Sequence, residues 1–277
     1  MHDARRRMSY AFLCAVPVLA GGLTAVRPLR VSGVYQTVGA AHFAAICLAT
    51  WILGARVIRS GAEEGRRIAV AGALLLAPTA IVSLLWVGLG PPWVASPVEN
   101  RMRYLVLLAG AMAVAGAFVV LKDVLSEAGE RLYSTLGFAA NIFAGTAYLF
   151  WLSSQIGVFV LKVRDGQVSP AIVSLSDMFD TLLFVACVLT YLSTAAFAAS
   201  LGRIRWLGRG ATRVYVLASL AAVLFLALRG LSFPDPTASS TPWYLRPGFI
   251  AGIPAVPWIM PFLLGVVLLR RAGDQRL

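Results

Sequence analysis

Six polar or ionisable residues interrupt long hydrophobic stretches of the sequence, and their chemistry suits the binding of an ion, a proton or a small substrate. They are Gln36, His42, Gln155, Asp177, Asp180 and Arg229. Carboxylates and an imidazole can carry protons or hold cations, and a guanidinium can bind an anion or balance a carboxylate. Ionisable groups within a membrane face the bundle or water, and frequently mark ion and substrate pathways. These residues are therefore our candidate binding site.

The segment SLSDMFDTLLF contains both carboxylates of this set. Asp177 and Asp180 lie three residues apart and so share one face of a helix. Arg229 is the natural counter-ion for either of them, because an unpaired buried charge is costly. A second interpretation stays open: the apolar run from Thr181 is long enough to span a bilayer, so a helix that begins near Met178 would leave both carboxylates at the wet interface.

Three prolines fall in the stretch GIPAVPWIMPFLLG, within the last hydrophobic run. Pro254, Pro257 and Pro261 have i, i+3, i+7 spacing, so they share a helical face, and each frees the carbonyl four residues earlier. Those carbonyls belong to Ile250, Ile253 and Pro257. In lipid, neighbouring helices or enclosed water must satisfy them. The stretch predicts a kinked last helix whose proline face points into the bundle, either as a hinge beside a cavity or for packing alone.

Several familiar chemistries have no signature in the sequence. It contains no HExxH, P-loop or GxSxG motif. The two lysines lie at predicted helix ends, which does not suit a retinal Schiff base, and the second histidine lies in the N-terminal tail, which leaves His42 without a partner for haem. His42 itself is either an interior residue or a proton carrier. Cys14, Cys47 and Cys187 lie in apolar runs and are interpreted as small hydrophobic residues. We therefore expect no metal and no cofactor.

The composition identifies the medium around these residues. Of the 277 residues, 59% are hydrophobic and 13% are charged, and the mean hydropathy is +0.81. Soluble proteins carry about 25% charged residues, so the solvent here is lipid. The net charge of +12 does not indicate a nucleic-acid partner, because the basic residues punctuate hydrophobic runs instead of gathering on one face. The sequence predicts an all-α integral membrane protein, with residues 1–277 as a single transmembrane domain.

Hydrophobic runs bounded by charges predict a bundle of about eight transmembrane helices. A bilayer core needs roughly 20 apolar residues per helix, and charges mark the helix ends. The first run also resembles a signal peptide, but so many hydrophobic runs follow that it serves equally well as a first helix. The predicted spans are Met8–Val26, Val34–Val57, Ile68–Gly90, Tyr104–Leu121, Leu136–Leu161, Ala171–Leu201, Thr212–Leu231 and Phe249–Leu269.

Two stretches of similar pattern suggest that these helices form two parallel repeats of four. ARVIRSGAEEGRRIAVAGALLL, from Ala55, and ASLGRIRWLGRGATRVYVLASL, from Ala199, each join a helix end to an Arg-rich loop and a new Ala/Val/Leu helix. The repeats would cover residues 8–125 and 132–272. Chance similarity is the alternative, because sequence rich in Ala, Leu and Val aligns easily with itself.

The distribution of basic residues predicts the orientation. The tails and loops on one side hold 16 of the 24 Lys and Arg residues, namely those within Arg5–Arg7, Arg56–Arg67, Lys122–Arg131, Arg203–Arg213 and Arg270–Arg276. Cytoplasmic loops carry the excess of basic residues. We therefore expect a multi-pass protein of the bacterial inner (plasma) membrane, with both termini in the cytoplasm.

The leading hypothesis is a small transporter or permease-like protein. Its outward-facing polar cavity would be lined by the six candidate residues. Asp177 and Asp180 would bind a cation or a proton, Arg229 would hold them poised or bind an anionic group, and the kinked last helix would be a wall or hinge. The partners we expect are the lipid bilayer and a small-molecule or ion substrate.

Two other functions are compatible with the sequence. The chain could be a structural or regulatory membrane subunit, whose small-residue faces dock partner helices or another copy of the chain. An intramembrane enzyme acting on lipid is less favoured, because His42 and Asp180 are the sole plausible catalytic pair. The sequence therefore favours a protein that is not an enzyme, and it does not identify a substrate.

Overall fold

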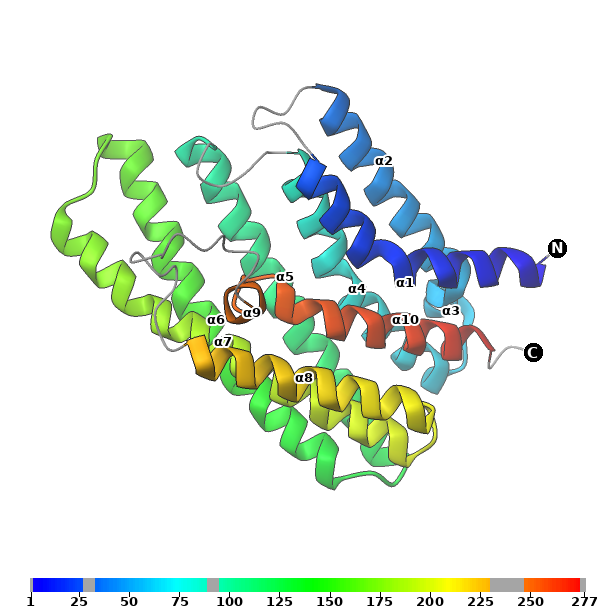
Figure 1. The fold of residues 1–277 in the computed structure, drawn as a ribbon. Helices are drawn as coiled ribbons and strands as arrows, with labels where there is room; N and C mark the ends of the chain where they lie inside the picture. Colours follow the sequence, from blue (N-terminus) through cyan, green and yellow to red (C-terminus); the bar gives the residue numbers. More distant parts are fainter. Residues whose placement is uncertain (1, 27–32, 89–94, 230–246, 275–277) are drawn as a thin grey trace. The chain divides into compact units, whose positions relative to one another are not determined.

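The computed structural model describes residues 2–26, 33–88, 95–229 and 247–274, and these residues form helices joined by short turns, with no strand among them (Figure 1). The long helices are α1 (His2–Val26), α2 (Gly33–Thr50), α4 (Glu63–Gly88), α5 (Pro97–Glu127), α6 (Leu132–Asp165), α7 (Pro170–Arg203), α8 (Arg209–Arg229) and α10 (Ile259–Asp274). The short elements are the π-helix η1 (Trp51–Ala55), α3 (Val57–Ser60), α9 (Pro247–Ala251) and the 3₁₀ helix η3 (Val256–Trp258).

Seven of the described helices are long and apolar enough to cross a membrane. Their limits are Gly33–Ala55, Glu63–Leu85, Pro97–Glu127, Leu132–Asp165, Pro170–Arg203, Arg209–Arg229 and Val256–Asp274. The described residues are thus all-helical, as predicted, and seven of their helices suit a membrane protein. The remaining predicted span, Met8–Val26, lies within α1, which is not among the seven, so the count of eight stays a prediction.

The helices extend beyond the charged residues that mark the ends of the predicted spans. The fourth predicted span covered Tyr104–Leu121, but α5 begins at Pro97 and ends at Glu127. Ser96 and Glu99 form a reciprocal capping box at its start: the Ser96 N–H donates to Glu99 Oε2 at 2.7 Å, and the Glu99 N–H donates to Ser96 Oγ at 3.3 Å. Charges mark where lipid ends, whereas capping residues mark where the helix ends.

The chain divides into two compact units. The first unit comprises residues 1–121 and 261–277, and the second comprises residues 122–260. The first unit therefore holds α1, α2, η1, α3, α4, most of α5 and nearly all of α10. The second unit holds the end of α5, then α6, α7, α8, α9 and η3, and the start of α10. The two predicted four-helix repeats stay a prediction.

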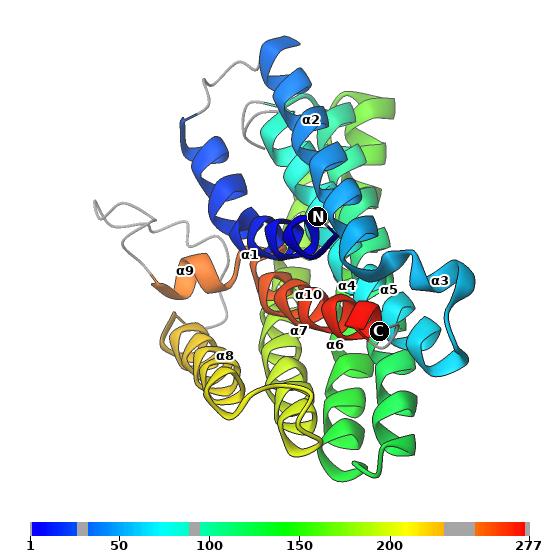
Figure 2. The ribbon, with the colours of Figure 1, turned by 90° about the vertical axis from the view of Figure 1, so that its right-hand side faces the viewer.

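The helices α4 and α10 of the first unit lie side by side (Figure 2), and glycines allow them to approach closely. A Cβ atom on Gly265 of α10 would lie 2.8 Å from the Gly72 carbonyl oxygen of α4, and one on Gly72 would lie 3.0 Å from the Gly265 oxygen. A Cβ on Gly54 of η1 would lie 2.0 Å from the Leu269 carbonyl oxygen. Small residues at such contacts are the usual means by which membrane helices pack backbone against backbone.

We expect Gly265→Ala to lower the free energy of unfolding by about 1–3 kcal/mol, because the added methyl group overlaps the α4 backbone. Gly116→Ala is the matched control. A Cβ atom there meets nothing within 4 Å, so alanine should be neutral or should stabilise α5 by about 0.5–1 kcal/mol. Thermal unfolding in detergent measures both changes, and equal midpoints for the two variants would contradict this contact.

An arginine near the N-terminus ties together three elements of the first unit. Arg6 is buried, and its Nη2 donates to the Leu53 oxygen at 3.4 Å and to the Arg270 oxygen at 3.2 Å. The same nitrogen lies 2.8 Å from Asp274 Oδ1. The start of α1 therefore lies against the end of α10.

In the second unit, α7 packs extensively against both α6 and α8 (Figure 1). The α6–α7 hairpin turns at Gly166, whose φ of 76° is left-handed and whose N–H donates to the Lys162 oxygen at 3.2 Å. Pro170 then occupies the first turn of α7, where its missing N–H has no helical partner to lose. Each helix has 34 residues and is therefore about 51 Å long, well beyond the roughly 30 Å of a bilayer core.

The proline-rich stretch is broken, and not only kinked as the sequence predicted. The helix α9 ends at Ala251, and α10 begins at Ile259, so the predicted helix Phe249–Leu269 is interrupted by turns and η3. Pro254 lies inside the interruption, whereas Pro257 and Pro261 lie near the starts of η3 and α10, where proline is tolerated. Three prolines within eight residues remove too many N–H donors for a continuous helix.

Candidate functional site

Two tyrosines satisfy backbone carbonyls at the helix break. Tyr148 of α6 donates from Oη to the Pro254 oxygen at 3.2 Å, and Tyr191 of α7 donates to the Ala251 oxygen at 3.2 Å. Both side chains are buried. The ring of Trp258 lies 5.5 Å from the Tyr148 ring, measured between centroids, and adds an aromatic contact below the break. Neighbouring helices thus supply the hydrogen bonds that lipid cannot.

Two of the carbonyls predicted to be freed are satisfied within the break itself. The N–H of Ile253 donates to the Ile250 oxygen at 3.1 Å, and the N–H of Val256 donates to the Ile253 oxygen at 2.9 Å. The side-chain donors instead reach carbonyls that the prediction did not name. The reason is that the chain folds into consecutive turns here and does not continue as a helix.

A buried thiol contributes a third donor to the break. Cys187 lies one helical turn before Tyr191, on the same face of α7, and its Sγ lies 3.9 Å from the Gly252 oxygen. Its sulfur is also 3.7 Å from Tyr148 Oη. The sequence interpretation of this cysteine as a small hydrophobic residue is therefore incomplete, because the thiol also makes weak hydrogen bonds.

The guanidinium of Arg229 lies against the other side of the break. Its Nη1 is 3.5 Å from the Gly248 oxygen, and a Cβ atom on Gly252 would lie 2.2 Å from the same nitrogen. A Cβ on Gly248 would lie 2.4 Å from the Phe225 oxygen of α8. Two glycines four residues apart therefore let the chain before the break pack directly on α8 and its last arginine.

A polar cluster lies further along the α6–α7 interface, around one of the two predicted carboxylates. Trp151 donates from Nε1 to Asp180 Oδ1 at 2.8 Å, and Gln155 donates from Nε2 to the same oxygen at 3.3 Å. Gln155 also lies 3.0 Å from Ser176 Oγ. Trp151 is buried, whereas Gln155 and Asp180 are half-buried. We call Trp151, Gln155, Ser176 and Asp180 the carboxylate cluster.

The carboxylate cluster and the break are joined by helical periodicity. On α6, Tyr148, Trp151 and Gln155 have i, i+3, i+7 spacing and share a face. On α7, Asp180 and Cys187 are separated by seven residues, or about two turns, and also share a face. The α6–α7 interface thus carries polar groups both at the carboxylate cluster and at the break, with buried Leu183 between Asp180 and Cys187, and we call this face the polar seam.

The structure brings together only some of the predicted site residues. Gln155 and Asp180 are in contact, and Arg229 lies in the same unit at the break. Asp177 lies within α7, but its side chain is outside the described residues. The helix α7 begins at Pro170 and not near Met178, but whether the two carboxylates lie within the lipid or at the wet interface stays a prediction. The pairing of Arg229 with either carboxylate stays a prediction.

The two remaining candidates lie on α2, in the first unit. Gln36 is exposed, and His42 is half-buried with its ring 6.2 Å from the Phe12 ring in an edge-on contact. Whether they share a cavity with Asp180 stays a prediction. Within the described part of the chain, no group of three His, Cys, Asp or Glu side chains is arranged to hold a metal ion.

Sequence reasoning missed a carboxylate at the opposite end of the α6–α7 hairpin. Glu130 is buried and accepts hydrogen bonds from the N–H groups of Tyr133 and Ser134, both at 3.0 Å, and from Ser200 Oγ of α7. It therefore caps the start of α6 and links it to the end of α7. Burial raises the pKa of Glu130, but the hydrogen bonds from Ser200, Tyr133 and Ser134 and the charge of Arg203 outweigh it, so the pKa is lowered.

We expect Glu130→Gln to cost about 1–3 kcal/mol of unfolding free energy at neutral pH, because glutamine retains only one acceptor oxygen for several donors. A lowered pKa means that the carboxylate stabilises the fold fully above its ordinary value of 4.5, and that this contribution is lost as the pH falls through the lowered value. The difference in unfolding midpoint between wild type and Glu130→Gln should therefore shrink below pH 4.5. A difference that stays constant down to pH 3 would contradict the capping role.

Comparisons with known protein families, curated proteins and solved structures find no match for this chain. The class of protein is therefore defined by its own helices. The described residues define an all-helical protein with seven helices long and apolar enough to cross a membrane, a helix break between α9 and α10, and polar side chains between two long helices.

Proposed function

We propose that this chain is a small permease-like transporter of the inner membrane, in which Asp180 binds a proton or a cation. The observation that carries the proposal is the carboxylate cluster beside a broken membrane span. Broken helices are common at the binding sites of secondary transporters, where unwound backbone lines the substrate or ion path. A carboxylate within a membrane-spanning segment is most readily explained by function.

The depth of Asp180 supports this role. It lies ten residues after the start of α7, or roughly 15 Å along the helix. If α7, about 51 Å long, is centred on a 30 Å core, it extends about 10 Å beyond each side, and Asp180 would then lie about 5 Å inside the hydrocarbon edge. The carboxylate is thus shallow enough to exchange ions with water and deep enough to be shielded from bulk solvent.

The orientation we propose is both termini in the cytoplasm. The excess of basic residues supports it, because the turn between α7 and α8 carries Arg203, Arg205 and Arg209. The ion pair of Arg6 with Asp274 supports placing both ends of the chain on one side. In this orientation the carboxylate cluster opens outward, at the far end of the α6–α7 hairpin from Glu130.

In this proposal the other candidate residues complete the cavity. Gln36, His42 and Asp177 would line it, and Arg229 would hold the carboxylates poised or bind an anionic group. The proline break, with Pro254, Pro257 and Pro261, would form its wall or hinge.

Reconstituted vesicles test the proposal. The purified full chain in liposomes that contain a trapped pH dye should move protons when an inward proton gradient, or an outward Na⁺ or K⁺ gradient, is imposed. Empty liposomes are the control for passive leak. Proton and cation fluxes equal to those of empty liposomes, under all of these gradients, would contradict the proposal.

One observation favours a second function, that of a membrane subunit without a transport site. The carbonyls of Ala251, Gly252 and Pro254 already accept donors from Tyr191, Cys187 and Tyr148, so the break is firmly docked. Such docking suits a fixed packing device as well as a wall of a cavity. A subunit of this kind would be unaffected by loss of the Asp180 charge.

A further inference from the structure

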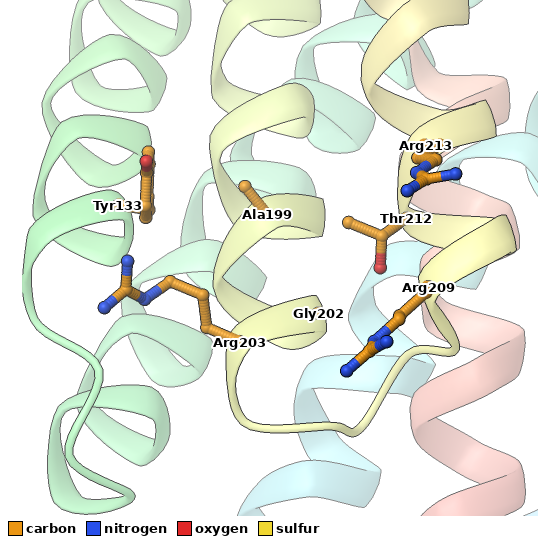
Figure 3. A pocket seen from close by; sticks show the side chains of 7 residues that line it. All are labelled: Tyr133, Ala199, Gly202, Arg203, Arg209, Thr212 and Arg213. Carbon is orange, nitrogen blue, oxygen red and sulfur yellow. The ribbon is translucent and has the colours of Figure 1, made fainter.

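A second polar site lies at the opposite end of the second unit, where α7 turns into α8. An open cleft of about 310 Å³ is formed there by the ends of α6, α7 and α8 (Figure 3). Its lining residues are Tyr133, Ala199, Gly202, Arg203, Arg209, Thr212 and Arg213. Three of the seven are arginines and none is acidic, so the cleft is strongly positive. We call it the basic cleft.

The arginines come from two helices that a tight turn holds in place. Arg203 ends α7, and Arg209 begins α8. Between them, the N–H groups of Trp206 and Leu207 both donate to the Leu201 oxygen, at 2.8 and 3.1 Å. Arg205 has a φ of 59°, the left-handed conformation that such a reversal requires.

Close packing of α7 and α8 fixes the floor of the basic cleft. A Cβ atom on Gly202 would lie 2.5 Å from Thr212 Oγ1, so glycine is what allows Thr212 to sit between the helices. Figure 3 shows Thr212 beside Gly202, with Arg209 and Arg213 on either side of it along α8. Arg209, Thr212 and Arg213 have i, i+3, i+4 spacing and therefore share a face of α8.

The charges in the basic cleft favour an anion. Arg203 stacks on the Tyr133 ring at 5.5 Å and lies near Glu130, so one of the three guanidiniums has protein partners. Arg209 and Arg213 are like charges four residues apart, an arrangement that destabilises a helix unless an anion offsets it. Planar guanidiniums bind phosphate oxygens with two parallel hydrogen bonds, and they do so better than lysine.

The position of the basic cleft relative to the membrane identifies the kind of anion. One helix apolar enough to cross a membrane ends at Arg203 and the next begins at Arg209, so a membrane crossed by both would have its lipid headgroups at the level of the cleft. Basic pockets between membrane helices on the side rich in Lys and Arg bind the phosphates of acidic lipids.

The geometry points to a binding site for the phosphate group of an anionic phospholipid in the basic cleft. Arg209 and Arg213 hold the phosphate, with Thr212 between them and Arg203 at the rim. A soluble phosphate ester carries the same chemistry, and the experiment below separates the two sources. The inference is independent of the transport proposal, because it involves neither Asp180 nor the helix break.

The test is lipid retention by the purified full chain in a neutral detergent. Phosphatidylglycerol or cardiolipin is titrated in, and bound lipid is counted by native mass spectrometry. Phosphatidylcholine is the control lipid. Inorganic phosphate and glycerol 3-phosphate are tested as soluble ligands, and their binding is measured as a shift in the unfolding temperature of the protein. We expect the anionic lipids to bind and phosphatidylcholine to be retained roughly tenfold less.

Matched variants assign the binding to the basic cleft. The double variant Arg209→Gln with Arg213→Gln should weaken anionic lipid binding by about tenfold or more. The control is Arg66→Gln, an exposed arginine on α4 outside the cleft, which should leave binding unchanged. Arg209→Lys with Arg213→Lys keeps the charge but loses the paired hydrogen bonds, so it should give an intermediate affinity.

The outcomes discriminate among the possible ligands. Arginine-dependent binding of lipid, without any effect of millimolar soluble phosphate, supports the proposal. Arginine-dependent stabilisation by soluble phosphate alone overturns the lipid source and assigns the cleft to a phosphate ester. An equal loss per removed charge in the double variant and in Arg66→Gln would overturn a specific site, because binding would then follow only the net charge.

Discussion

Asp180→Asn is expected to reduce proton or cation movement in reconstituted vesicles to the level of empty liposomes. Asparagine keeps a carbonyl oxygen in place of Asp180 Oδ1, so the hydrogen bonds from Trp151 and Gln155 can persist. The substitution therefore removes the charge and the titratable proton while it conserves the local structure. Membrane abundance and the unfolding midpoint should stay close to those of the wild type.

Ser176→Ala is the matched control for this prediction. It removes one partner of Gln155 in the carboxylate cluster but leaves Asp180 and its two hydrogen bonds. We expect this variant to retain most of the transport rate. Transport by Asp180→Asn at the wild-type rate would show that the carboxylate has a packing role, and it would favour the docking subunit as the function.

Tyr148→Phe and Tyr191→Phe are expected to destabilise the protein by about 1–3 kcal/mol each, because each removes a buried hydroxyl donor from a backbone carbonyl of the break. The rings stay in place, so the loss reports the hydroxyl groups alone. The double variant should also lose transport if the break forms a wall of the cavity. Thermal unfolding in detergent measures the first effect, and the vesicle assay measures the second.

Tyr133→Phe is the control of the same chemistry. Its ring faces Arg203 at the basic cleft, and phenylalanine keeps that ring. We expect its unfolding free energy to change by less than about 0.5 kcal/mol. If all three tyrosine variants unfold at the same temperature as the wild type, side-chain donors do not hold the break.

The membrane class and most of the helices could be predicted because hydropathy reports directly on burial in lipid. The positions of the helix ends are predicted less accurately. Charges such as Arg101 and Lys122 lie inside α5, since a helix continues past the hydrocarbon once its cap is formed. The break was located correctly by its prolines, but its form was not, because Pro257 and Pro261 fit the starts of the next helices.

The candidate site could be predicted only where a residue is chemically conspicuous. Asp180 and Gln155 stand out in apolar sequence, yet their contact joins residues 25 positions apart, which no local pattern specifies. Tyr148 and Tyr191 are ordinary residues for a membrane helix. Their role as hydrogen-bond donors depends on carbonyl groups far along the chain. Glu130 lies in a charged turn, where hydropathy gives no sign that it is buried.

Cysteine accessibility tests whether the carboxylate cluster opens to water on the outer side of the membrane, as we propose. The background is the full chain with Cys14, Cys47 and Cys187 replaced by serine. The serine at position 187 keeps a hydrogen-bond donor near the Gly252 oxygen. Gln155→Cys and Val185→Cys are introduced separately and treated from outside with a membrane-impermeant methanethiosulfonate. Val185 is a partly exposed apolar residue of α7 and serves as the control.

We expect rapid labelling of the cysteine at position 155 from the outside, and little or none at position 185. Labelling at position 155 that is as slow as at position 185, or that occurs only when the reagent is admitted to the cytoplasmic side, would contradict an outward-facing polar cavity.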